Sequence, residues 1–245
     1  MRIDLNADVG EGFGPWSMGQ DEALIPLVTS VNVACGFHAG DPLTIERTLR
    51  LALECGASIG AHPGYPDREG FGRRALAMSP AELEAAILYQ VAALGGMCQA
   101  LGGRLRHVKP HGALYDRVRD DPEAAVAACR AVQRLADRSG APLILVAQPG
   151  SALLAAAADL GLPSAAEGFA DRAYEPDGRL RSRRLPGAVL EEPEAAAARA
   201  LSLARSGRFA TLCVHGDTPR APAIASAVRA ALEAAGHEVA APSAA

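Results

Sequence analysis

The stretch Val108-Lys109-Pro110-His111-Gly112-Ala113-Leu114-Tyr115 shows the pattern on which the chain is built. An apolar run stops at a cation, an imidazole and a phenol, and Pro110 and Gly112 end regular structure between them. One such strand end is compatible with a solvated turn that carries no function. Several other apolar runs end the same way, in polar, ionisable or glycine-flanked residues. The repetition indicates a site assembled from strand ends.

The apolar runs are spaced as strands that alternate with helices. Strands are expected near residues 2–7, 30–34, 57–61, 105–109, 142–147, 163–166 and 210–214, with a short eighth at 238–240. A run that is apolar at every position, such as 143–147, is typical of a parallel strand covered on both faces.

The helices between these strands are marked by capping residues and glycines. A capping side chain precedes a proline, which predicts a helix start, at Asp41-Pro42, Ser79-Pro80, Asp121-Pro122 and Thr218-Pro219. Helix ends are expected at glycines shortly before the next strand, namely Gly56, Gly102, Gly140, Gly161, Gly207 and Gly236.

This alternation predicts βαβ units with right-handed crossovers. Seven or eight units in 245 residues fit a closed (β/α) barrel, TIM-like and somewhat irregular, whose usual size is about 250 residues. A doubly wound open sheet is the rival, but neither a GxGxxG nor a Walker loop follows the first strand. We therefore expect one barrel domain over residues 1–245.

Composition narrows the class of protein further. The chain is 49% hydrophobic and 21% charged, as in ordinary soluble proteins, and its net charge of −4 with few aromatics argues against a nucleic-acid partner. Five cysteines, odd in number and without a CxxC pair, indicate a reduced, cytoplasmic chain. Neither a signal region nor an apolar run of about 20 residues is present, so no membrane association is expected.

In a barrel, all strands end at one face, where active sites lie. The candidate residues grouped there, in chain order, are Asn6, Asp8, Glu11, Asn32, His38, His62, Lys109, His111, Tyr115, Glu167, Asp171, Arg172, His215 and Asp217. Four histidines among carboxylates at one mouth are typical of metal or acid–base chemistry. Structural readings compete at other positions: Asp41 is assigned to helix capping, Cys35 and Cys213 to buried apolar packing, and His107 to a strand face.

Several long motifs resemble those of the LamB/YcsF family. They are Asp4–Glu11, Cys35–Pro42, Gly60–Asp67, Phe71-Gly72-Arg73, His107–Tyr115, Phe169–Arg172 and Val214–Asp217, and the resemblance runs from Met1 to about Ala240. It implies a barrel of the glycoside hydrolase/deacetylase type. It also implies the role of the A subunit of a prokaryotic 5-oxoprolinase, which opens 5-oxo-L-proline to L-glutamate with B and C subunits. ATP, with Mg2+, would be the co-substrate, and no organic prosthetic group is implied.

The chain departs from the family pattern in two places. The segment before the seventh strand, Ser206–Phe209, is shorter than in many members, and no proline precedes the arginine of the loop Leu180–Arg183. The first departure concerns the partner-facing surface, and neither touches the candidate residues at the strand ends.

The implied reaction suits these residue types, because a lactam is a poor electrophile until its oxygen is activated. Lys109 and Arg172 are candidates to neutralise the developing oxyanion or phosphate charge. Asp8 or Glu167 would act on the attacking water, and His62 or His111 would protonate the ring nitrogen. The other candidates at the mouth are assigned to substrate binding.

Arg183 joins the substrate-binding set because it matches the family's loop arginine. It lies in residues 172–186, a stretch without helix or strand periodicity in which Pro176-Asp177-Gly178 predicts a turn. We expect a hairpin or flap there that closes over the substrate.

Two other functions remain open at this point. One is a metal-dependent deacetylase or amidohydrolase without ATP, with Asp8, His62 and His111 as ligands. The other is a non-catalytic subunit that captures 5-oxoproline or a sugar. Because Lys109 and His111 follow a strand end, their replacement by alanine is expected to abolish turnover with little loss of stability.

Overall fold

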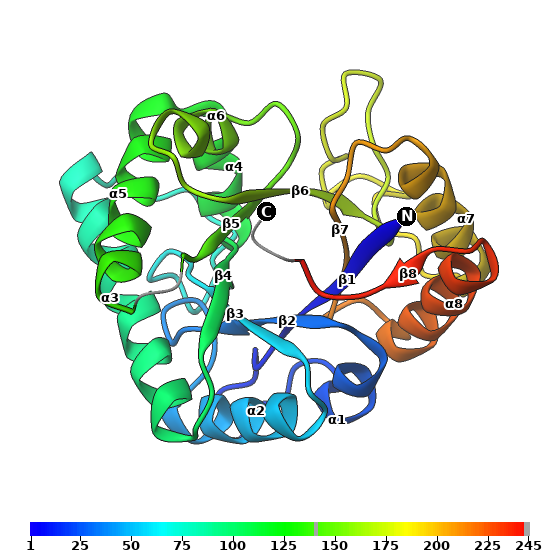
Figure 1. Ribbon diagram of the computed structural model, residues 1–245, viewed down its shortest axis with the longest axis horizontal. Coiled ribbons are helices and arrows are strands. Elements are labelled where there is room, and N and C mark those ends of the chain that lie inside the picture. The colour runs from blue at the N-terminus through cyan, green and yellow to red at the C-terminus, as the bar shows by residue number, and fades with distance from the viewer. Residues whose placement is uncertain (140–141, 243–245) are drawn as a thin grey trace.

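The computed structural model describes residues 1–139 and 142–242. Seven parallel strands close into a barrel with the helices outside it, and an eighth short strand lies beside the first (Figure 1). The strands are β1 (Arg2–Val9), β2 (Ser30–Ala34), β3 (Ser58–His62), β4 (Leu105–Val108), β5 (Ile144–Ala147), β6 (Ser164–Phe169), β7 (Thr211–His215) and β8 (Glu238–Val239). The helices are α1 (Asp21–Leu24), η1 (Ile25–Leu27), α2 (Pro42–Glu54), α3 (Pro80–Ala100), α4 (Gly112–Asp120), α5 (Pro122–Ser139), α6 (Ala152–Asp159), α7 (Pro193–Arg205) and α8 (Ala221–Ala234).

The first strand closes the ring. It pairs with β2 on one side, where Asp8 faces Asn32, and with β7 on the other, where Asp8 faces His215. The last strand, β8, is outside the ring and pairs with the beginning of β1. The expectation of a TIM-like barrel with seven or eight strands is therefore confirmed, with seven strands in the ring.

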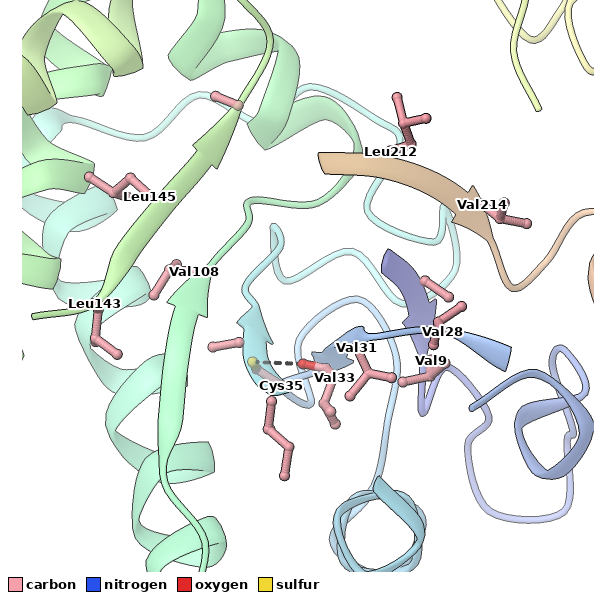
Figure 2. Close-up of a cluster of buried hydrophobic side chains, with 14 of the residues drawn as sticks. Val9, Val28, Val31, Val33, Cys35, Val108, Leu143, Leu145, Leu212 and Val214 are labelled. Atoms are coloured by element: carbon pink, nitrogen blue, oxygen red, sulfur yellow. Dashed lines mark hydrogen bonds between the residues drawn. The ribbon is translucent and has the colours of Figure 1, made fainter. Parts of the chain in front are cut away.

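One face of each strand supplies the apolar layer between barrel and helices. On β1 this face is Ile3, Leu5, Ala7 and Val9, all at most 1% exposed. Figure 2 shows residues of the same layer on other strands, among them Val31, Val33, Val108, Leu145, Leu212 and Val214. Burial of this layer against the helices supplies the main hydrophobic stabilisation.

The opposite face points into the barrel and is largely polar. Asp4, Asn6 and Asp8 alternate with the apolar residues of β1, as the two-residue period of a strand requires. Asp4 accepts hydrogen bonds from Ser30 and Thr211, which come from the two neighbouring strands. This interior differs from the layers of branched apolar side chains that usually fill a (β/α) barrel.

This interior changes where several predicted residues lie. Asn6 and Asn32 fall inside the expected strands 2–7 and 30–34 and lie in β1 and β2. Asp8 and Glu167 were placed after the expected strands but lie within β1 and β6, and His62 and His215 are the last residues of β3 and β7. The predicted strand ends were too early for β1 and β6, because polar side chains were read as loop residues although they face a polar barrel interior.

Three of the four predicted helix starts are confirmed. Asp41 and Ser79 accept backbone hydrogen bonds at the starts of α2 and α3, and Asp121 does so before α5. The fourth is wrong, because Thr218 donates its hydroxyl to Asp171 and α8 begins at Ala221. The glycine ends are confirmed by positive φ angles at Gly56, Gly102, Gly161, Gly207 and Gly236, whereas Gly140 lies outside the described residues.

The segment after β6 forms the expected hairpin. Bridges join Arg172 to Val189 and Tyr174 to Leu180, and the Gly178 N–H donates to Glu175 O at 2.9 Å across the predicted turn. The segment is drawn in yellow in Figure 1, where it projects beyond the barrel. Among the described residues, no helix has the length and apolar character needed to span a membrane.

Candidate active site at the barrel mouth

A cavity of about 420 Å³ opens at the carboxyl ends of the strands. Of the predicted site residues, those that line it are Asp8, His62, Lys109, His111, Tyr115, Arg172, Arg183 and His215. Those that do not line it are Asn6, Glu11, Asn32, His38, Glu167, Asp171 and Asp217. Most of the second group contact the first, so the barrel brings the predicted residues into one connected network.

Lys109 lies at the centre of this network with 2% of its side chain exposed. Its ammonium nitrogen Nζ is 2.9 Å from both Asp8 Oδ1 and Glu167 Oε1. It also donates to Asn6 Oδ1 at 3.3 Å and to Cys213 Sγ at 3.0 Å. Burial alone would lower the pKa of Lys109, but Asp8, Cys213 and Glu167 outweigh it and raise that pKa well above its usual value.

Asp8 forms an ion pair with Lys109 and also lines the cavity. Asn32 Nδ2 donates to Asp8 Oδ1 at 2.8 Å, and Asp8 Oδ2 is 3.5 Å from His62 Nε2. Burial raises the pKa of Asp8, but the charges of His62 and Lys109 outweigh it and hold the pKa well below its usual range. The lowered pKa favours the ionised form of Asp8 near neutral pH.

Glu167 plays a different part, because it is completely buried behind the cavity wall. It accepts hydrogen bonds from Asn6 Nδ2 at 3.1 Å and from the Tyr115 hydroxyl at 2.9 Å, besides its ion pair with Lys109. Its oxygens are thus used to hold Lys109 and Tyr115 in place.

Two histidines at the mouth have fixed tautomers when neutral. His62 Nδ1 is 2.7 Å from Lys109 O, and His111 Nε2 is 2.8 Å from Phe71 O. A carbonyl oxygen can only accept, so each of these nitrogens carries a hydrogen. The remaining nitrogens, His62 Nε2 and His111 Nδ1, lie 3.0 Å apart.

Phe71 aims its carbonyl at His111 from an unusual backbone conformation. Its φ of 54° is in the left-handed region, which costs energy in a residue other than glycine and is frequent at functional sites. The Ala113 N–H donates to Gly72 O at 2.9 Å, and a Cβ on Gly112 would lie 2.6 Å from the same oxygen. Gly112 is therefore what lets this loop approach the start of α4.

Glu11 and His38 lie behind the two histidines. His38 Nε2 is 3.3 Å from Glu11 Oε1, and the His38 ring stacks on His111 with centroids 3.8 Å apart. Burial, reinforced by Asp8 and Asp217, raises the pKa of Glu11 well above its usual value. Burial also lowers the pKa of His38 and of His111 well below the usual value.

Asp171 and His215 form a hydrogen-bonded pair on the other side of the mouth. His215 Nδ1 donates to Asp171 Oδ1 at 2.9 Å, which leaves Nε2 free on a ring that lines the cavity. Thr218 and the His215 backbone N–H also donate to Asp171. Burial raises the pKa of Asp171, but these contacts outweigh it and lower that pKa to about 2. A buried carboxylate that orients an imidazole in this way is typical of proton-transfer sites.

Arginines surround the cavity entrance. Arg73 and Arg183 both pair with Asp217, which is 11% exposed. Arg172 instead donates to Ala188 O and Arg181 O, so it holds the hairpin closed on itself.

Two residues of the network, Arg73 and Cys213, were not predicted as members of it, whereas His107 lies on a strand face as expected. Arg73 was seen only as part of a motif, because it follows no strand directly. Cys213 is buried as expected but accepts a hydrogen bond from Lys109. His107 faces the barrel interior, with Nε2 2.8 Å from Asn32 Oδ1. A simple count would have singled out Lys109, because it is the only lysine in the sequence.

Comparison with known proteins agrees with this architecture. The chain is 51% identical to the A subunit of 5-oxoprolinase from Methylococcus capsulatus over 98% of this chain and 95% of the relative. The lactam utilization protein of Thermus thermophilus superposes with a TM-score of 0.91 at 45% identity, covering 99% of this chain and 100% of the other.

A more distant structure shares the fold alone. It is the catalytic domain of a peptidoglycan N-acetylglucosamine deacetylase from Eubacterium rectale, with a TM-score of 0.55 at 9% identity over 99% of this chain and 89% of the other. The family model described as the LamB/YcsF family matches residues 3–245. With the shared barrel and the near-complete match to these relatives, the chain belongs to the LamB/YcsF family.

Proposed function

We propose that this chain is the A subunit of a 5-oxoprolinase, a cytoplasmic hydrolase that opens 5-oxo-L-proline to L-glutamate. The observation that carries the proposal is the identity of about half of all residues, over nearly the whole chain, to relatives named as the A subunit of 5-oxoprolinase. The site supports it, since a cavity of about 420 Å³ suits a small substrate.

The charges of the cavity suit an anionic lactam. Arg73, Arg183 and Arg119 line its wall, and Lys109 and Asp8 lie among the deeper lining residues. A guanidinium binds a carboxylate through two parallel hydrogen bonds, which fixes orientation as well as position. The 5-oxoproline carboxylate would bind at the arginines, with its ring amide toward Lys109 and Asp8.

Coupling to ATP supplies the activation that an amide lacks. The γ-phosphoryl group of ATP, with Mg2+, is transferred to the lactam oxygen, and ADP leaves. Water adds to the activated carbon, and the ring C–N bond breaks as the nitrogen takes up a proton. A second water hydrolyses the resulting acyl phosphate to L-glutamate and phosphate.

Three groups of this chain would serve these steps. Lys109 stabilises negative charge that develops on the lactam or phosphate oxygens. Asp8 stays ionised and accepts a hydrogen bond from the attacking water, which orients it. His215, oriented by Asp171, takes the proton-transfer role expected of His62 or His111: its Nε2 accepts a proton from the attacking water and passes that proton to the departing ring nitrogen.

B and C subunits belong to the proposal for two reasons. The relatives are named as subunits, and the sequence contains neither a Walker loop nor a GxGxxG loop after a strand. We therefore assign nucleotide binding to the assembled enzyme.

The test uses 5-oxoproline with a carbon label, and product glutamate is measured by chromatography. The complete set of subunits should form glutamate only with ATP, and His215→Gln in this chain should abolish its formation. Glutamate formation without ATP would favour the amidohydrolase alternative. Tight binding without any product, even with B and C subunits and ATP, would favour the non-catalytic capture role.

A further inference from the structure

His62 and His111 present their lone pairs to each other. Because His62 Nδ1 and His111 Nε2 donate to backbone carbonyls, the facing nitrogens carry no hydrogen when the rings are neutral. These nitrogens, His62 Nε2 and His111 Nδ1, are 3.0 Å apart. Two lone pairs at this distance repel unless they share a cation. The backbone thus holds the two rings in an arrangement that needs a positive charge at this point.

A buried carboxylate faces the same point. Glu11 Oε1 is 3.6 Å from His111 Nδ1, and the Glu11 side chain is 4% exposed. Within the described part of the chain, the only basic groups within 4.0 Å of this carboxylate are the rings of His38 and His111. On the opposite side, Asp8 Oδ2 is 3.5 Å from His62 Nε2. Negative charge therefore flanks the facing nitrogens on both sides.

We propose that Glu11, His62 and His111 bind one divalent transition-metal ion of the zinc class, with Asp8 as a second carboxylate beside it. Donor atoms of Glu11, His62 and His111 all lie within 4.8 Å of one another. Two nitrogens 3.0 Å apart, each about 2.1 Å from an ion, subtend an angle of about 90° there, which one ion can satisfy. Because His62 and His111 line the cavity, the remaining coordination positions face the substrate space.

The surroundings of the three ligands have the form that metal sites require. A histidine that binds a metal through one nitrogen usually donates from the other to a carbonyl or carboxylate, which orients the ring. The bonds from His62 to Lys109 O and from His111 to Phe71 O fill this role. The left-handed backbone of Phe71 is thereby explained as the conformation that directs its carbonyl at His111.

His38 is assigned to positioning Glu11. Its ring is nearly parallel to that of His111, with an interplanar angle of 6° and a centroid distance of 3.8 Å. The lone pairs of two stacked rings lie in two separate, nearly parallel planes, so both cannot point directly at one ion. His38 Nε2 instead lies 3.3 Å from Glu11 Oε1, where it can donate a hydrogen bond and hold the carboxylate.

A competing group of donors nearby is Asp8, Cys213 and His215. The Lys109 ammonium lies among them, 2.9 Å from Asp8 Oδ1 and 3.0 Å from Cys213 Sγ. A second cation there would be repelled by that charge. Cys213 and His215 therefore provide matched control positions.

The experiment uses the intact chain after treatment with a chelator. Zn2+ alone is titrated by calorimetry, and Co2+ by its visible absorption. We expect one ion per chain and a cobalt spectrum without the intense charge-transfer band that a sulfur ligand gives. Loss of an outer contact costs about 10- to 100-fold in metal affinity, so Glu11→Gln and His111→Gln should each weaken Zn2+ binding at least about 100-fold. Cys213→Ser and His215→Gln should bind Zn2+ as the unmodified chain does.

Three results would overturn the proposal. They are the absence of Zn2+ and Co2+ binding to the unmodified chain, unchanged affinity in Glu11→Gln, or a sulfur-to-cobalt band that places the ion at Cys213. In the first case, the charge shared by His62 and His111 is a proton. Should a ligand variant fail to fold, the stoichiometry and cobalt spectrum of the unmodified chain decide the question. None of these measurements involves 5-oxoproline. They therefore test the metal site independently of the proposed 5-oxoprolinase function.

Discussion

At the scale of single residues, Lys109 shows most clearly how the site depends on burial. The chain uses arginine for every other basic residue besides histidine, and its one lysine is buried inside the barrel. A compact ammonium reaches Asp8, Glu167 and Cys213 at once inside the barrel. Placement after a strand end suggested that its loss would spare stability, but its burial reverses that expectation.

Lys109→Met should therefore abolish turnover and also lower the free energy of unfolding. Removing one partner of a buried ion pair usually costs about 3–5 kcal/mol, because the other charge is left unpaired. Glu167→Gln in the same chain should restore part of the loss, since it removes one of the unpaired carboxylates. Urea unfolding at pH 7 measures the free energy of unfolding of the single variant and of the double variant. A Lys109→Met chain as stable as the original would show that the ion pairs contribute no net stability.

A second residue-scale prediction concerns Asp4 at the lower end of the barrel. Burial raises its pKa from 3.8 to about 6, so the folded state holds its proton more tightly than the unfolded state. Its contribution to stability is present below pH 4 and is lost as the pH rises to about 6. By linkage this amounts to about 3 kcal/mol.

Asp4→Asn should remove the loss of stability that ionisation of Asp4 causes as the pH rises to about 6. The free energy of unfolding of the variant, minus that of the original chain, should rise between pH 4 and pH 6 and then level off. Asp171→Asn is the control of opposite sign, because the pKa of Asp171 is lowered to about 2 and its stabilisation is lost only as the pH falls below about 4. If the difference in free energy of unfolding between Asp4→Asn and the original chain does not vary with pH, the raised pKa of Asp4 is contradicted.

At the scale of elements, the hairpin after β6 joins the cavity to the surface. The Arg172 guanidinium donates hydrogen bonds to Ala188 O and Arg181 O and so connects the two sides of the hairpin. Arg183 points toward Asp217 with a side chain 22% exposed, whereas Arg179 is 58% exposed and pairs with Asp120. Both arginines line the cavity, but only Arg183 shares an anchor with Arg73.

This difference predicts unequal effects of two otherwise matched substitutions. Arg183→Ala should raise the Michaelis constant or lower the turnover number about tenfold or more, since a hydrogen bond to a charged group contributes about 1.5–3 kcal/mol. Arg179→Ala should change neither, because exposed ion pairs contribute little. Steady-state kinetics of the assembled enzyme measures both. Equal effects would mean that the hairpin carries no specific anion contact.

At the scale of the whole molecule, the barrel gathers the candidate catalytic side chains Asp8, Lys109 and His215 around the cavity at the strand ends. We expect the isolated chain to turn over 5-oxoproline poorly or not at all and to gain activity when B and C subunits are added with ATP. The assay is glutamate formation by this chain alone, by the B and C subunits alone, and by all three. Robust ATP-coupled turnover by the isolated chain would refute this division of labour.

The sequence by itself determined the fold class and most of the site's membership. Apolar runs, capping residues such as Asp41 and Ser79, and terminal glycines are local signals, and they sufficed to predict alternating strands and helices. The parallel arrangement then required the strand ends to meet at one face. Polar and ionisable residues at these strand ends could therefore be identified as candidate site residues from their residue type alone.

Only the tertiary structure decided how those residues are paired. Closure of β1 against both β2 and β7 brings Asp8 beside Asn32 and His215, and places Lys109 against Asp8, 101 residues away in the chain. The expected first strand ended at residue 7, so Asp8 was placed beyond it, although β1 continues to Val9. The facing lone pairs of His62 and His111 depend on two backbone carbonyls from other segments. Such contacts arise from barrel closure, a long-range property that local sequence patterns do not contain.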